Sequence, residues 1–141
     1  MLTEIRNRCN AVEECYEFML AYAAQGLPSD AGSRSGGQIR EFLGRAVEAL
    51  EELSESCTMA VKEAGLESPE RYTAFFAVME RDASDSLAAL DMVLAQPVIS
   101  SQLIDNLNAS IHLRALLTDL FLISDILSAT NTAAQTTAGC E

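Results

Sequence analysis

Leu103–Leu127 reads LIDNLNASIHLRALLTDLFLISDIL, and its apolar residues recur at alternating steps of three and four. This spacing lines the apolar side chains along one side of an α-helix. We therefore expect a helix that begins between Pro97 and Ser101 and ends near Ser128. Because so apolar a helix must be covered by other elements, the stretch predicts a fold of packed helices.

Three other stretches show the same spacing, at about 3–25, 38–64 and 69–95. Gly26 ends the first and Gly65 the second, because glycine readily adopts the left-handed backbone of a helix stop. Thr3 is placed to cap the first stretch, and Ser68 followed by Pro69 is typical of the start of the third. Local signals therefore mark the expected helix boundaries.

Short connections between successive helices make neighbours antiparallel. We therefore expect an all-α, antiparallel up-down-up-down four-helix bundle over residues 1–128, followed by a flexible, disordered tail over 129–141 that shows no apolar periodicity. Leu50 and Phe76 lie on the expected inward faces, so we expect an aspartate at either position to unfold the chain.

The charge of the chain limits its partners. Its 21 acidic and 9 basic residues give a formal net charge of −12. Such a surface repels phosphate backbones and anionic lipids, so we expect neither nucleic acid nor membrane as a partner, and a basic protein partner is favoured. Residues 1–6 contain no apolar signal region, and we expect a cytoplasmic protein.

Catalytic and metal signatures are weak in this sequence. Its one histidine, His112, has no glutamate three residues before it, as a di-iron bundle would require. The four cysteines are not paired at metal-ligand spacing, and no Gly-x-Ser-x-Gly elbow occurs. We therefore expect no enzyme, no metal site and no cofactor.

Cys9 and Cys57 lie near one end of the expected bundle, on stripes that face each other. They form a candidate thiol pair, although small buried thiols that merely fill the core are the favoured interpretation. Phe75, Phe76 and Phe121 are expected at the same level of the core.

The longest connection, 27–37, precedes the second expected helix. Arg34, Gly36, Gly37 and Arg40 could hold an anion or the carboxylate of a partner there, because a helix start offers free N–H groups and a favourable dipole. The segment does not match a phosphate-binding loop, and a flexible linker is the alternative.

The last apolar stretch carries more apolar residues than one inward stripe needs. Leu122, Ile123 and Ile126 are the candidate interface residues, for a second copy of the chain or for another protein. The alternative is that this helix is simply the most deeply buried of the four.

These observations favour a non-catalytic, acidic helical protein-interaction module, such as an adaptor, assembly factor or chaperone-like protein, that forms a homodimer. The alternative function is a bundle that binds a small ligand, cofactor or metal in its interior. Tyr16, Met79 and His112 are the candidate contacts for such an interior ligand.

Overall fold

The computed structural model describes residues 2–65 and 69–139, and all regular secondary structure in these residues is helical. The helices are α1 (Leu2–Ala24), α2 (Arg34–Leu50), α3 (Leu53–Ala64), α4 (Pro69–Leu94), α5 (Ser101–Ala109) and α6 (His112–Gly139). The prediction of an all-α fold is therefore confirmed. The prediction of four unbroken helices is wrong, because two of the expected helices are each divided into two.

The second expected helix breaks after Leu50, where Glu52 takes a left-handed backbone with φ of 58°. The break leaves carbonyl groups at the end of α2 without helical donors. The Arg8 guanidinium of α1 donates to three carbonyls there, those of Glu48 at 3.5 Å, Ala49 at 2.9 Å and Glu51 at 2.5 Å. A contact between distant residues thus stabilises a break that the local sequence, rich in helix formers, does not indicate.

The last expected helix breaks between α5 and α6. Ile111 has a φ of 64°, and the Ser110 hydroxyl donates to the Leu107 carbonyl at 2.5 Å. The start of α5 follows the prediction, because Ser100 caps it by accepting from the Leu103 N–H. The far end does not follow it, because α6 continues to Gly139 and the expected disordered tail is helical through that residue.

Other boundaries match their local signals in part. Gly26 and Gly65 have φ values of 66° and 61°, as expected for helix stops, and α4 begins at Pro69. Helix α2 begins at Arg34, four residues before the expected start, and Thr3 lies inside α1 instead of capping it. The expected cap at Ser68 lies outside the described residues.

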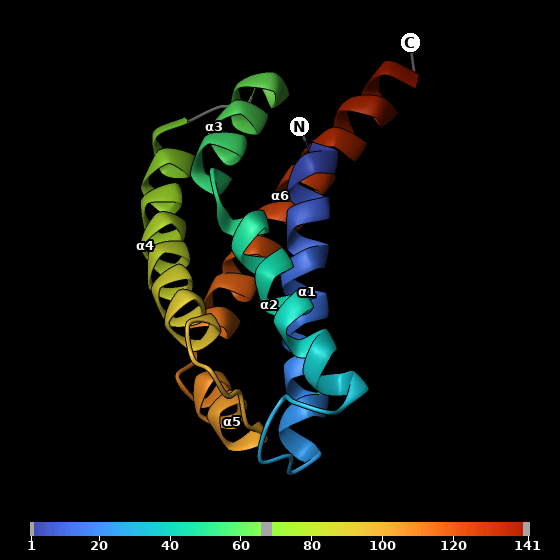
Figure 1. Cartoon of the computed structure of the whole chain (residues 1–141). Coiled ribbons are helices and arrows are strands. Elements are labelled where there is room, and N and C mark those ends of the chain that lie inside the picture. The colour runs from blue at the N-terminus through green and yellow to red at the C-terminus, as the bar shows by residue number, and fades with distance from the viewer. Residues whose placement is uncertain (1, 66–68, 140–141) are drawn as a thin grey trace.

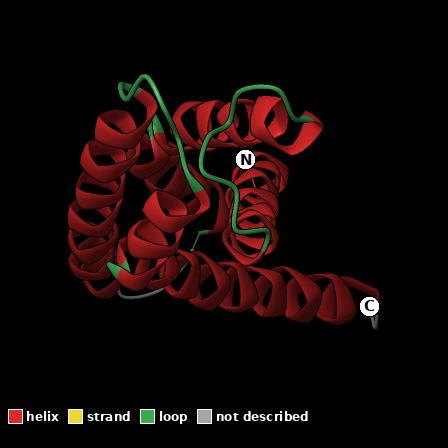
Figure 2. Ribbon diagram, turned by 60° about the horizontal axis from the view of Figure 1, so that its bottom comes forward, coloured by secondary structure: helices red, strands yellow, loops and turns green. Residues whose placement is uncertain are grey.

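The chain runs down α1, up through α2 and α3, down α4 and back up through α6 in Figure 1. The last turns of α6 extend beyond the start of α1 and away from the other helices (Figures 1 and 2). At the opposite end, the α1–α2 and α4–α5 loops lie side by side (Figure 2), and the Ser101 N–H donates to the Leu27 carbonyl at 2.8 Å.

One apolar core draws on all six described helices. Leu50 and Phe76 are buried in it, as expected. Cys9 and Cys57 are also buried there, whereas Phe121 is 43% exposed and does not belong to the core layer in which the sequence placed it. Leu120 and Ile123 lie on the inward face of α6, and Phe121, one residue after Leu120, projects about 100° away from it around the helix and toward solvent.

Candidate functional site

An apolar groove lies between the first half of α4 and the middle of α6. We call it the α4–α6 groove and define it by the six residues that line it: Arg71, Tyr72, Phe75, Leu122, Ile123 and Ile126. Its volume is about 310 Å³, at the lower end of the range for ligand pockets. Arg71 contributes the only charged side chain among these six residues.

The helical repeat explains why these residues meet. Tyr72 and Phe75 are three residues apart on α4, and Leu122 and Ile126 are four apart on α6, so each pair projects from one face of its helix. Ile123 also lines the groove but is 1% exposed, so it belongs to the core as well as to the groove. Tyr72 and Phe75 are half-buried against the same core.

The exposed wall of the groove is on α6. Leu122 is 50% exposed and Ile126 is 40% exposed. The sequence had singled out these two residues and Ile123 as an interface. The structure brings all three to one groove, but it buries Ile123, which therefore packs inward instead of facing a partner. Sequence reasoning missed Tyr72 and Phe75 as site residues, because their spacing is that of an ordinary inward stripe.

A polar contact lies further along the same two helices. Asp82 follows Phe75 by seven residues on α4, and Asp119 precedes Leu122 by three residues on α6. Burial is the main cause that raises the pKa of Asp119 to about 7. The neighbouring Asp82 carboxyl group adds to this effect, through a hydrogen bond and through its negative charge. Within the described part of the chain, the buried Oδ2 of Asp119 and the buried hydroxyl of Ser86 have no hydrogen-bond partner.

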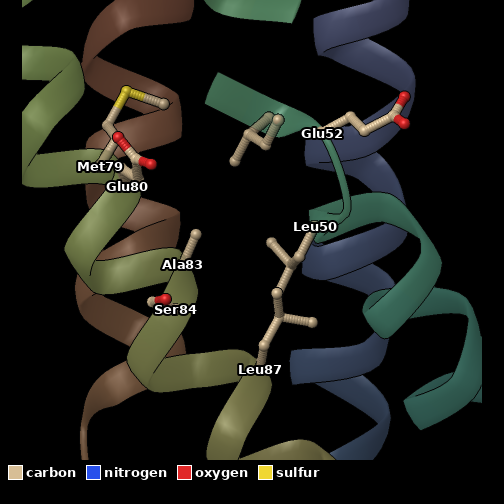
Figure 3. Close-up of a pocket in the computed structure, with 8 residues that line it drawn as sticks. Leu50, Glu52, Met79, Glu80, Ala83, Ser84 and Leu87 are labelled. Carbon is tan, nitrogen blue, oxygen red and sulfur yellow. The ribbon is translucent and has the colours of Figure 1, made fainter. Parts of the chain in front are cut away.

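A second, smaller pocket of about 190 Å³ lies beside the α2–α3 break. Its apolar wall is formed by Leu50, Leu53, Met79, Ala83 and Leu87. Three polar residues also line it, Glu52, Glu80 and Ser84. Leu50 and Leu87 point toward each other across it, and the Glu52 carboxylate points away from Met79 and Glu80 (Figure 3). The pocket therefore has a largely apolar wall, to which Glu80 and Ser84 add polar groups.

The three residues expected to contact an interior ligand do not form one site. Met79 is buried and lines the smaller pocket, whereas Tyr16 is half-buried on α1. His112 is the first residue of α6 and is exposed, so its assignment to the interior is wrong. The position directly after the Ile111 break explains this exposure, because the stripe of α6 begins only at Leu113.

The expected anion-binding loop is occupied by contacts within the chain. Arg40 pairs with Asp30 at 2.5 Å and donates to the carbonyls of Leu94 and Gln96 at 3.2 and 2.9 Å. It therefore ties the α1–α2 loop to the end of α4. The N–H of Gly36 donates to the Ser33 hydroxyl, and that of Gly37 to the Ser33 carbonyl. Arg34 is exposed, and these contacts do not favour an anion site.

The three cysteines in the described residues, Cys9, Cys15 and Cys57, are free thiols in the core. Burial raises the pKa of Cys9 to about 11, and the negative charge of Glu13 adds to this effect. Burial likewise raises the pKa of Cys15 and Cys57 to about 12. Such thiols are poor nucleophiles, because the reactive form is the thiolate. Cys140 lies outside the described residues.

The described residues contain no group of three or more histidine, cysteine, aspartate or glutamate side chains able to hold a metal ion. None of the described helices combines the length and the apolar character needed to cross a membrane. Comparisons of the chain with protein-family models, with curated proteins and with solved structures found no match.

Proposed function

We propose that the chain is a protein-interaction module and that the α4–α6 groove binds one apolar face of a helix from a basic partner protein. The observation that supports this most directly is the exposure of Leu122 and Ile126 beside the aromatic rings of Tyr72 and Phe75. A groove between two helices accepts the apolar stripe of a third, with anchors at steps of three and four.

Charge favours a basic partner over a second copy. The chain carries a net charge of −12, and the exposed Glu70 and Asp125 lie next to groove residues in the sequence. The net negative charge of the chain would attract a basic helix and raise its rate of association, and Arg71 is the one positive side chain among the six that line the groove. A second copy would bring another twelve negative charges and be repelled, so the expected homodimer remains a prediction to be tested beside the main proposal.

Site-specific crosslinking tests the groove directly. A photo-crosslinking amino acid replaces Leu122 in one variant and Met92 in another, and both are expressed in the cells that naturally contain the protein. Met92 is a matched control, because it is 64% exposed on α4. It lies seventeen residues from Phe75, or about 25 Å along the helix.

We expect position 122, and not position 92, to crosslink to a helix in a basic protein, and Leu122→Asp with Ile126→Asp to abolish recovery of that protein. Crosslinks to position 122 of another copy, with a concentration-dependent dimer in sedimentation, would instead support the homodimer. Equal crosslinking at both positions, or none at 122, would contradict the proposed function.

A further inference from the structure

The carboxyl groups of Asp82 and Asp119 present an unbalanced set of hydrogen-bonding atoms. They come from α4 and α6, which pack against each other, and they lie within hydrogen-bonding reach. An ionised carboxylate can only accept hydrogen bonds, so two ionised groups would place acceptor against acceptor. Within the described residues, Asp119 Oδ2 is buried and has no donor. One added proton would give the two carboxyl groups a donor.

We propose that Asp82 and Asp119 share one proton across the α4–α6 contact, and that loss of this proton loosens the two walls of the α4–α6 groove. The groove begins one helical turn away on α6, because Leu122 and Ile123 follow Asp119 by three and four residues. Any effect of this loosening on the binding of a partner rests on the proposed function, whereas the shared proton does not.

Among the described residues, the cations on the helices packed against α4 and α6 are exposed or paired elsewhere: Arg6, Arg34 and Lys62 are exposed, Arg8 pairs with Glu4, Arg40 with Asp30 and Arg45 with Glu41. On α1, Glu4 and Glu13 are half-buried, and Glu4 pairs with Arg8; the other acidic groups that α1 and α3 turn toward the core are thiols. The buried faces of α2 and α5 carry no charged side chain. On α4, Arg81 and Asp85 are exposed beside Asp82. On α6, His112, Arg114 and Asp125 are exposed. The charge that acts on Asp119 is that of Asp82.

The sign of the pH dependence follows from the two states. Burial and the neighbouring Asp82 raise the pKa of Asp119 to about 7 in the folded chain, whereas the unfolded chain releases this proton near the ordinary aspartate pKa of 3.8. Folding therefore takes up a proton between these values, and the stability that this proton provides is lost as the pH rises toward and through 7. Glu4 and Asp30 have lowered pKa values and affect stability only at more acidic pH.

The test compares Asp119→Asn with Asp85→Asn, an exposed aspartate on α4, and follows unfolding by denaturant from pH 5 to 8. Histidines titrate in this range, so every protein carries His112→Gln. We expect the unfolding midpoint of the reference and of Asp85→Asn to fall as the pH rises. Asp119→Asn should keep a constant midpoint, because its amide donates permanently to Asp82.

Carbon-13 NMR of the folded reference protein provides a second measurement that does not depend on a variant folding. The Asp119 carboxyl carbon should titrate near pH 7, and Asp82→Asn should lower that midpoint by removing a negative neighbour. A midpoint below pH 5, or equal pH profiles for the reference and Asp119→Asn, would overturn the shared proton.

The methyl signals of Leu122 and Ile126 report on the groove in the same titration. We expect them to shift with the Asp119 midpoint, while the methyl signals of the exposed Leu20 on α1 do not. Groove signals that ignore this midpoint would overturn the link between the proton and the groove. Neither measurement needs a partner, so failure of the crosslinking experiment is distinguishable from failure of this inference.

Discussion

Gly36 shows how one residue fixes the approach of the α1–α2 loop to α2. A Cβ atom built at this position would collide with the backbone carbonyl of Asp30. The same aspartate accepts from Arg40 and from the Ile99 N–H, at 2.5 and 2.7 Å, so its position matters to two loops. The glycine that the sequence suggested for anion binding is therefore required for close packing of backbone against backbone.

This collision predicts opposite effects for two adjacent glycines. Gly36→Ala should lower the free energy of unfolding by about 1–3 kcal/mol, because the loop must move to accommodate the methyl group. Gly37 is exposed in the same helix turn with nothing within 4 Å of its added Cβ, so Gly37→Ala should raise it by up to about 1 kcal/mol. Urea unfolding measures both, and equal stabilities for the two variants would contradict the packing argument.

At the scale of elements, the α2–α3 break places a glutamate in an unfavourable backbone conformation. A left-handed backbone costs a non-glycine residue roughly 1–2 kcal/mol, and Glu52 has a φ of 58° and no side-chain cap bond. The contacts of Arg8 with the end of α2 offset part of this cost. The break is therefore stabilised in part by α1.

Glu52→Gly should consequently stabilise the chain, by about 0.5–1 kcal/mol, because glycine adopts this backbone without the steric penalty. The matched control is Glu55→Gly, an exposed position inside α3, which should destabilise by about 1 kcal/mol. Thermal unfolding of the two variants measures the difference. A Glu52→Gly variant that loses stability would indicate that the glutamate itself holds the break.

Features of the fold that depend on neighbouring residues could be predicted from the sequence, whereas features that depend on contacts between distant residues could not. The starts at Pro69 and Ser101 and the stops at Gly26 and Gly65 depend on neighbouring residues, and they were predictable. The breaks depend on contacts such as that between Arg8 and Ala49, forty-one residues apart, and leave no local pattern.

The candidate site divides in the same way. Leu122 and Ile126 were predictable from the apolar surplus of one helix. Tyr72 and Phe75 were missed as groove residues, because periodicity does not distinguish the centre of a stripe from its edge. The nearness of Asp82 to Asp119 depends on how α4 and α6 are aligned along each other, which no single helix reveals.

For the whole molecule, the three described thiols report on the integrity of one core shared by all the helices. Cys9 and Cys15 come from α1 and Cys57 from α3, and each is at most 5% exposed. A pKa of about 11 leaves roughly one Cys9 thiol in a thousand ionised at pH 8, and about 12 leaves still fewer at Cys15 and Cys57. Low exposure and low ionisation both slow reaction with a thiol reagent.

In a Cys140→Ser background, these three thiols should therefore resist a disulfide reagent at pH 8 in the folded state, and all three should react at once when denaturant unfolds the chain. Phe76→Asp should abolish the protection, because it buries a charge in the same core. The number of thiols released, measured by absorbance, distinguishes the outcomes. Rapid reaction of one thiol in the folded reference would mean that its helix opens independently of the rest.

The same experiment tests the disulfide between Cys9 and Cys57 that the sequence left open. If these two residues react in denaturant only after a reductant is added, they form that disulfide, and the view of them as neutral core thiols is wrong.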